Sequence, residues 1–399
     1  MNDPIIAEAA PLPPVPRRTA PLSIPFQARL NPGVEAARRH TLGWLHGYGM
    51  LCGEAATAEY DALRLDRLMA YFYPDADAAE LALATDFNAW FFLFDDQFDG
   101  PLGQCPEAVA HFVDRVVRTM DDAPDLLPEE PDSPLVAGYR DIWQRITDGA
   151  PRAWQLRFKG HWERYLSAYH WEAQNRTRKG VLPLEQYLKG RRDSIGVQPC
   201  LDFAERCGGY VLPRELHGRP PLAELRRLTA EAVIFVNDIV SVDKELAAGD
   251  VNNSVIILHR STGCTLDQAV RRIARTASAR VDQFQELTSV LPATLKELGM
   301  PSAVHDHVAH YVASMRHLIS GNLVWSRETP RYDDSGTAAV RSRPWADLFT
   351  AADPGVPAAD PGVPAADPGV PAAGPGTPAA GPGAPAAGPG VPVPRQHER

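Results

Sequence analysis

The sequence predicts an all-α protein, in which one helical domain lies between two low-complexity ends. Three observations support this fold class. Through most of residues 26–350, apolar residues recur every three or four positions, which is the spacing of one helix face. Proline and glycine mark the joins between these segments. The sequence contains no alternating apolar and polar run bounded by hairpin turns.

The helical pattern is clearest in eight segments. In chain order they cover residues 33–51, 77–99, 108–122, 153–177, 184–196, 222–249, 266–287 and 302–326. On the order of ten helices in one domain of this length can surround a central cavity. We therefore expect a single domain over residues 26–350, with its helices wrapped around a cavity.

The two ends of the chain do not share this pattern. Residues 1–25 contain seven prolines. Residues 351–399 repeat a seven-residue unit that begins AADPGVP, and two prolines and a glycine in each unit exclude a helix. We expect both ends to be disordered, with the tail as an extended spacer that leans toward the polyproline conformation.

Composition excludes several classes of protein. A net charge of −10, with no basic stripe carrying interleaved aromatics, argues against a nucleic-acid partner. No apolar run approaches the ~20 residues that cross a bilayer, so we expect no stable membrane insertion. Five scattered cysteines without CxxC spacing are typical of free thiols in a reducing compartment. The expected location is cytoplasmic.

A first group of acids follows an aromatic run in the sequence FFLFDDQFDG, residues 91–100. The Gly100-Pro101 pair predicts that the helix ends there. Asp95 and Asp99 would then lie one turn apart on one face, with Asp96 beside them. Carboxylates at the negative end of a helix dipole are disfavoured by about 0.3–1 kcal/mol each. A bound divalent cation would reverse that cost, and Mg²⁺ prefers such oxygen ligands.

A second group of oxygen-bearing side chains lies in residues 232–250. Asn237, Ser241 and Glu245 are four residues apart, so they form a stripe about 12 Å long on one helix face. Their oxygens are hard ligands that suit Mg²⁺ better than soft metals. Lys244 can reach a phosphate as a point charge. Considered singly, each polar residue is also compatible with an ordinary core or surface role.

Together, these motifs resemble those of bacterial class I terpene synthases. DDQFD at residues 95–99 is similar to the family's DDxxD motif, and NDIVSVDKE at 237–245 is similar to its NDxxSxxKE motif. RRDSIG at 191–196 resembles the family's diphosphate-sensing arginine with a helix-break glycine, and RYDD at 331–334 resembles its Arg-Tyr pair. The resemblance covers residues 22–350. It implies the class I terpenoid synthase fold with a central active-site cavity.

The resemblance also implies ligands and their residues. Asp95 would bridge two Mg²⁺ ions with Asp99 assisting, and Asn237, Ser241 and Glu245 would chelate a third; Mn²⁺ is a substitute. The residues expected to bind the substrate diphosphate are Arg191, Lys244, Arg331 and Tyr332. Only one of Arg191 and Arg192 can face the cavity, since adjacent helical residues point about 100° apart. The spacing to Asn237 favours Arg191.

Aromatic side chains are the expected wall of the cavity, because their faces stabilise a carbocation through cation–π attraction. Phe91 and Phe92 lie one turn before Asp95, and the family tends to place a tryptophan at the position of Trp325. Ile195 and Val236 are expected to add apolar surface to the cavity wall. Ordinary helix core is the alternative for each aromatic residue.

The implied reaction is ionisation and cyclisation of an isoprenyl diphosphate. We expect farnesyl diphosphate and a sesquiterpene hydrocarbon or alcohol, with geranyl and geranylgeranyl diphosphate as alternatives. A chain-elongating prenyl diphosphate synthase would carry a second Asp-rich motif in place of Asn/Ser/Glu, and a class II cyclase would need DxDD, which does not occur. A helical scaffold that uses the repeat tail is the alternative from another class. The family also suggests a homodimer.

Overall fold

Helices provide all the regular secondary structure of the described residues, which are 22, 24–121, 133–178, 180–339 and 342–349 in the computed structural model. The elements are α1 (Val34–Gly47), α2 (Gly53–Ala62), α3 (Leu65–Phe72), α4 (Ala78–Asp96), η1 (Pro101–Gln104), α5 (Pro106–Arg118), α6 (Pro134–Thr147), α7 (Arg152–Thr177), α8 (Leu184–Ser194), α9 (Val197–Cys207), α10 (Arg214–His217), α11 (Leu222–Ala248), α12 (Ser254–Thr262), α13 (Leu266–Glu297), α14 (Ser302–Glu328), η3 (Pro330–Tyr332) and α15 (Asp334–Ala338). The all-α prediction is confirmed. The disorder predicted for residues 1–25 and 351–399 stays a prediction, because all of these residues except 22, 24 and 25 lie outside the described part.

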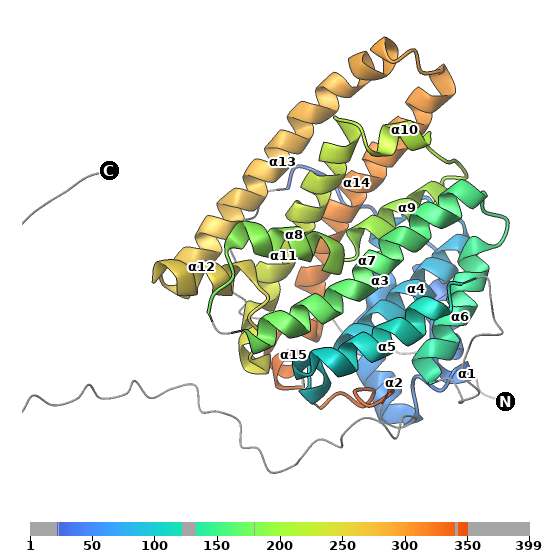
Figure 1. The fold of residues 1–399 in the computed structure, drawn as a ribbon. Helices are drawn as coiled ribbons and strands as arrows, with labels where there is room; N and C mark the ends of the chain where they lie inside the picture. The colour runs from blue at the N-terminus through green and yellow to red at the C-terminus, as the bar shows by residue number, and fades with distance from the viewer. Residues whose placement is uncertain (1–21, 23, 122–132, 179, 340–341, 350–399) are drawn as a thin grey trace, which may run out of the picture. The chain divides into compact units, whose positions relative to one another are not determined.

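The long helices pack in two groups around the buried aromatic core. Helix α11 packs against both α13 and α14, and these three lie together in Figure 1. Helix α4 packs against α1, α3 and α6, while α5 lies against α7. Large side chains such as Phe87, Trp90 and Trp162 are at most 1% exposed, and the rings of Phe87 and Trp90 on α4 meet the Trp162 ring on α7 edge to face. These contacts fix α4 and α7, which carry much of the candidate site.

Helix α4 ends earlier than the sequence predicted. Asp77 caps its start by accepting from the backbone N–H groups of Ala79 and Glu80, both at 2.9 Å. The helix stops at Asp96, four residues before Gly100, and the chain continues through tighter turns such as Phe98 N–H to the Asp95 carbonyl at 3.0 Å. The expectation that Asp99 lies on the same helix is therefore wrong.

The Gln97 side chain explains this early end. Its Nε2 donates to the Leu93 carbonyl at 2.8 Å and to the Trp345 carbonyl at 2.7 Å, and its Oε1 accepts from the Leu348 N–H at 3.0 Å. The Gln97 side chain thus donates to the Leu93 carbonyl, a group that would otherwise accept from a backbone N–H of the next helical turn. Residues 342–349 are held against the end of α4, and Phe349 stacks on Phe112 at 4.4 Å between ring centroids.

A glycine separates α8 from α9. Gly196 has a φ of +73°, a backbone conformation that side chains rarely adopt. A Cβ at this position would also lie 3.0 Å from Cε1 of Phe91. The helix break expected at Gly196 is therefore present, and it brings the backbone close to an aromatic ring of α4.

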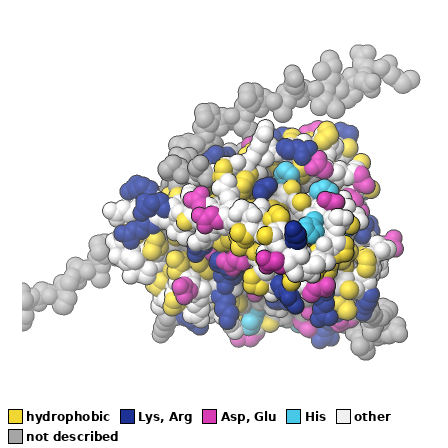
Figure 2. Space-filling view, turned by 90° about the horizontal axis from the view of Figure 1, so that it is seen from above, with side chains coloured by type: hydrophobic (Ala, Val, Ile, Leu, Met, Phe, Trp, Pro, Cys, Tyr) yellow, Lys and Arg dark blue, Asp and Glu magenta, His cyan; other side chains and the backbone are white. Residues whose placement is uncertain are grey.

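The surface shows no unusual concentration of one side-chain type in the view of Figure 2, where acidic, basic and apolar side chains are intermixed. Within the described ranges, no helix combines the length and apolar character needed to cross a bilayer.

Candidate active site

One cavity brings together all the residues that were predicted to bind metal or diphosphate or to form the aromatic wall. It holds about 1080 Å³ of empty space, counting its open mouth, and is bounded by α3, α4, α7, α8, α9, α11, α14 and η3. The predicted residues that line it are Phe91, Phe92, Asp95, Asp99, Arg191, Asn237, Ser241, Lys244, Glu245, Trp325, Arg331 and Tyr332. They come from five elements and the turn after α4.

The Asp-rich motif is paired with two cations across the cavity. Lys244 Nζ lies 2.7 Å from Asp99 Oδ2, and Arg331 Nη2 lies 3.2 Å from Asp95 Oδ2. Burial raises the pKa of Asp99 in spite of the Lys244 ammonium, and the charge of Asp99 raises the pKa of Lys244 in spite of burial. The acids and cations of this rim therefore hold one another in place.

Asp96, the middle acid of the motif, does not line the cavity. Its Oδ1 accepts from Arg331 Nη2 at 2.6 Å, and its Oδ2 accepts from the Trp345 indole N–H at 2.8 Å. It is 3% exposed, and in spite of this burial the positive charges of Arg331 and Arg343 lower its pKa. Asp96 thus anchors Arg331 and the 342–349 segment behind the rim.

The stripe on α11 lies opposite the Asp-rich motif. Asn237 Oδ1 accepts from Arg191 Nη2 at 2.9 Å, while Asn237 Nδ2 donates to the Tyr332 hydroxyl at 3.2 Å. One turn on, the Ser241 hydroxyl donates to Glu245 Oε1 at 2.7 Å. Burial, together with the nearby charges of Asp238 and Asp250, raises the pKa of Glu245 to about 8. A cation beside Glu245 would oppose this effect.

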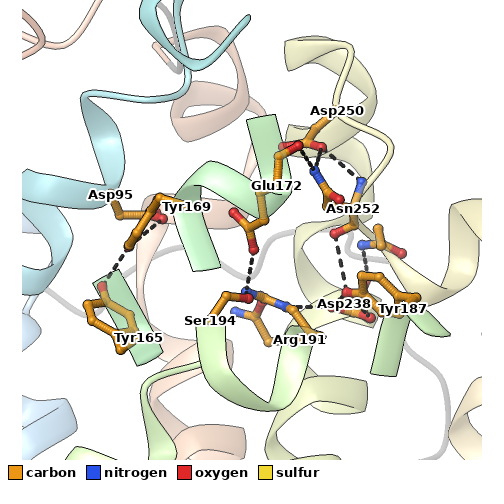
Figure 3. A network of polar contacts seen from close by, with 12 residues as sticks. Asp95, Tyr165, Tyr169, Glu172, Tyr187, Arg191, Ser194, Asp238, Asp250 and Asn252 are labelled. Carbon is orange, nitrogen blue, oxygen red and sulfur yellow. Dashed lines mark hydrogen bonds and ion pairs between the residues drawn. The ribbon is translucent and has the colours of Figure 1, made fainter. Parts of the chain in front are cut away.

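Arg191 and Arg192 point in different directions. Arg191 lines the cavity, and its Nη1 lies 3.5 Å from a carboxylate oxygen of Glu172 (Figure 3). Arg192 instead donates to Glu231 at 2.8 Å and does not line the cavity. The geometry therefore agrees with the choice of Arg191.

Aromatic rings form the wall next to the rim. The Phe92 and Trp325 rings meet edge to face at 5.5 Å, and the Arg331 guanidinium lies 4.8 Å from the centroid of the Phe92 ring. The Trp325 indole N–H donates to the Arg64 carbonyl at 3.0 Å, and Arg64 does not line the cavity. The polar end of the indole is therefore directed away from the cavity. Phe91 stacks on Trp162 at 4.7 Å.

Ile195 lines the cavity as expected, but Val236 does not. Val236 is adjacent to Asn237 in sequence and therefore points about 100° away from it on the helix. Val233, which is four residues before Asn237, lies on the same face and lines the cavity instead.

Sequence reasoning missed a polar stripe on α7. Tyr165, Tyr169, Glu172 and Arg176 line the cavity, and the Tyr169 hydroxyl donates to Asp95 at 3.3 Å (Figure 3). Their spacing of four, three and four residues is a helix-face pattern that could have identified them.

The missed stripe continues onto the loop that follows α11. Arg176 Nη2 lies 2.7 Å from Asp250, whose other oxygen accepts from Asn252 Nδ2 at 2.8 Å. Both Asp250 and Asn252 line the cavity.

The donor chemistry of the cavity fits a hard divalent cation. No three His, Cys, Asp or Glu side chains converge on one point within the described residues. The donors on the two sides are two carboxylates, Asp95 and Asp99, and a stripe of amide, hydroxyl and carboxylate oxygens on α11. All are oxygens, the ligand type that Mg²⁺ takes in proteins together with water and phosphate oxygens.

Known proteins are similar to this chain in sequence and in fold. The family model described as "Terpene synthase family 2, C-terminal metal binding" matches residues 86–283. Pristinol synthase of Streptomyces pristinaespiralis is 56% identical over 346 residues, which are 86% of this chain and 93% of that protein. Isoafricanol synthase of Streptomyces violaceusniger is 49% identical over 350 residues, covering 84% of this chain and 91% of that protein.

A solved structure extends the comparison to the fold. The crystal structure of germacradien-4-ol synthase from Streptomyces citricolor superimposes with a TM-score of 0.68 at 30% identity, covering 78% of this chain and 100% of that one. These similarities, together with the cavity and its metal-binding family signature, show that the chain belongs to the terpene synthase family and is a class I terpene synthase.

Proposed function

We propose that this enzyme is a Mg²⁺-dependent cyclase of farnesyl diphosphate, which releases diphosphate and forms a cyclic sesquiterpene hydrocarbon or alcohol. One observation supports this most strongly: an aromatic wall, two sets of oxygen donors and four cations line the same cavity. The relatives are bacterial sesquiterpene synthases, which supports a fifteen-carbon substrate.

Asp95 and Asp99 on one side, and Asn237, Ser241 and Glu245 on the other, would hold the Mg²⁺ ions, of which we expect three. When bound, such ions supply positive charge that stabilises the leaving diphosphate.

The cations of the cavity would bind the diphosphate itself. Lys244 and Arg331 each have more N–H donors than their present carboxylate partners use, since an ammonium has three and a guanidinium five. Arg191 is held by Asn237 and Ser194, and its Nε has no hydrogen-bond partner among the described residues. Donors aimed at developing charge in a water-poor site lower the barrier most.

After ionisation, the wall would govern the fate of the carbocation. Phe91, Phe92 and Trp325 are aromatic, and the face of an aromatic ring attracts a cation without reacting with it. The fold fixes these rings firmly, because Gly196 approaches Phe91 closely and the Trp325 N–H is bonded to the backbone. A fixed contour restricts the conformations of a flexible chain, which favours ring closure.

Incubation with geranyl, farnesyl and geranylgeranyl diphosphate, each with Mg²⁺ or with EDTA, tests the proposal. Gas chromatography–mass spectrometry of the organic extract should show a cyclic fifteen-carbon product that appears only with Mg²⁺. Cyclic ten- or twenty-carbon products would identify a monoterpene or diterpene cyclase instead. Longer linear diphosphates would indicate chain elongation.

Deletion of residues 351–399 addresses the scaffold alternative. The deletion leaves residues 342–349 in place against the end of α4, so we expect cyclase turnover to be unchanged. Loss of turnover in a folded truncated protein would mean that the repeat tail contributes to function, and the domain limit at residue 350 would be wrong.

A further inference from the structure

A carboxamide in the wall of the cavity lacks a partner for its N–H donors. Asn322 lies on α14 one turn before Trp325 and lines the cavity. Its side chain is 5% exposed, and its buried Nδ2 has no hydrogen-bond partner among the described residues. An unpaired amide in a protein interior costs free energy, so such a group normally has water or a ligand as its partner.

Asn322 lies beyond the aromatic wall as seen from the metal motifs. It precedes Trp325 by three residues, about 4.5 Å along the helix axis, whereas the Arg-Tyr pair follows Trp325. On α4, Asn88 likewise precedes Phe92 by one turn, and the Asp-rich motif follows. Because the Phe92 and Trp325 rings touch, both amides lie on the inner side of this ring pair.

Of these two amides, Asn322 is the one whose Nδ2 has no hydrogen-bond partner among the described residues. Asn88 Nδ2 already donates to the Leu65 carbonyl at 3.2 Å. Much of the remaining lining of the inner cavity is apolar, including Leu68, Phe72 and Val233. A water molecule there has few polar groups to bind, and Asn322 provides both a donor and an acceptor.

On the basis of the proposed function, we infer that Asn322 positions the water molecule that ends the reaction, so that the main product is an alcohol. The water oxygen forms the new C–O bond with the cationic carbon. The resulting oxonium loses a proton, which the inorganic diphosphate released in the same turnover accepts. Charge and atoms therefore balance without any further reagent.

The amide suits this role because it is not a base. A carboxylate or a neutral imidazole at the same place would accept a proton from the carbocation and give a hydrocarbon. An amide hydrogen-bonds water and leaves the protons of the carbocation in place. Water held at one point also reacts only with the carbon that reaches that point, so Asn322 would fix the position of the hydroxyl.

The test uses the full-length protein with farnesyl diphosphate, Mg²⁺ and ¹⁸O-enriched water. The wild type should give an alcohol that carries ¹⁸O. Asn322→Leu, which matches the size of the amide but forms no hydrogen bond, should lower the ratio of alcohol to hydrocarbon by about tenfold or more. Total diphosphate release should change much less, because Asn322 acts after ionisation. Asn322→Ser, which supplies a hydroxyl that can hydrogen-bond water, should recover part of the alcohol.

Ser320→Ala is the matched control. Ser320 is buried on the same helix, its hydroxyl donates to the Arg316 carbonyl at 2.9 Å, and it does not line the cavity. The ratio of alcohol to hydrocarbon formed by Ser320→Ala should equal that of the wild type. If Asn322→Leu does not fold, Asn322→Met replaces it, because methionine adapts to irregular space.

Three results have distinct meanings. A wild type that forms only hydrocarbons overturns the inference, and so does an apolar variant that keeps the wild-type alcohol fraction. A wild type that consumes none of the three diphosphates instead contradicts the proposed function itself.

Discussion

Two clusters of acidic and basic side chains in this enzyme serve different purposes. The rim cluster consists of Asp95, Asp99, Lys244 and Arg331, and each member lines the cavity. The α9 network consists of His161, Asp202, Glu205, His217, Arg226 and Arg157, none of which lines the cavity. The comparison separates charges that are available to a ligand from charges that serve the fold.

In the α9 network, the geometry determines which nitrogens carry protons. Arg226 Nη1 lies 2.6 Å from His217 Nδ1, and its Nη2 lies 3.3 Å from His161 Nε2. A guanidinium can only donate, so both of these ring nitrogens accept. The opposite nitrogens face carboxylates: His161 Nδ1 contacts Asp202, and His217 Nε2 lies 3.1 Å from Glu205. Each ring therefore lies between a cation on one side and an anion on the other.

The same contacts tie several elements together. Asp202 and Glu205 are on α9 and are fully buried, Arg157 and His161 are on α7, and Arg226 is on α11. Arg157 Nη2 lies 2.7 Å from Glu205. In the rim cluster, by contrast, the side chain of Asp95 is 45% exposed. We expect loss of a charge to reduce stability in the α9 network and to reduce turnover at the rim.

The largest effect on stability is expected for Asp202→Ala. This change removes the buried carboxylate that Arg157 and Arg226 share: Arg157 keeps Glu205, but Arg226 loses its carboxylate partner. Breaking a buried ion pair in this way typically costs about 3–5 kcal/mol of unfolding free energy. Urea unfolding followed by circular dichroism measures the loss. Asp114→Ala is the control, because the exposed Asp114–Arg118 pair on α5 should contribute at most about 0.5 kcal/mol. Equal losses in the two variants would mean that the α9 network does not stabilise the fold.

Asp95→Ala should show the opposite behaviour. Removing a carboxylate that we assign to the metal should lower turnover roughly 10²–10³-fold. Because Asp95 is half exposed, its unfolding free energy should change by less than about 1 kcal/mol. Diphosphate release per folded molecule is the measurement, with Asp114→Ala as the control again. A loss of stability as large as that of Asp202→Ala would contradict the distinction between the two clusters.

The smallest effect is a pH dependence of stability to which His161 of the α9 network should contribute. Burial, with a contribution from Arg226 and Arg164, lowers the pKa of His161 in spite of Asp202. The unfolded chain therefore takes up a proton near pH 6.5, while the folded protein does not. Stability should fall as pH decreases below about 6.5, by at most roughly 1.4 kcal/mol per pH unit, until the folded pKa is reached.

His161→Gln removes this titration and keeps a hydrogen-bonding side chain. Urea unfolding at about pH 7 and about pH 5.5 should then show a smaller difference than in the wild type. Asp202 stays ionised over this range, because His161, Arg226 and Arg157 hold its pKa below the usual value. An unchanged pH dependence in the variant would assign the effect to another group.

The sequence was sufficient to predict the parts of the site that have a regular spacing. The stripe of Asn237, Ser241 and Glu245 needed only the period of one helix, and the aromatic run beside the Asp-rich motif was visible directly. The end of α4 was not predictable, because it depends on a contact between Gln97 and Trp345, 248 residues away in the chain. The Gly-Pro stop signal was real, but this tertiary contact ends the helix first.

The α9 network illustrates a second limit. Its members come from four helices, and within each helix they look like ordinary surface charges. Only their burial shows that they form one cluster. The stripe on α7 was partly predictable. Its spacing is regular, but its aromatic and charged members resemble a mixed, partly exposed helix face.

The pairing of Lys244 with Asp99, and of Arg331 with Asp95, has a consequence for ligand affinity. If, as we propose, metal ions bind these carboxylates and these cations bind diphosphate, a metal ion would compete with each cation for its carboxylate and would free that cation to bind diphosphate. Each ligand thus removes a competitor of the other, which makes their binding positively cooperative. By linkage, the factor by which the metal increases diphosphate affinity equals the factor by which diphosphate increases metal affinity. The rim therefore discriminates against either ligand alone and favours the complete substrate–metal complex.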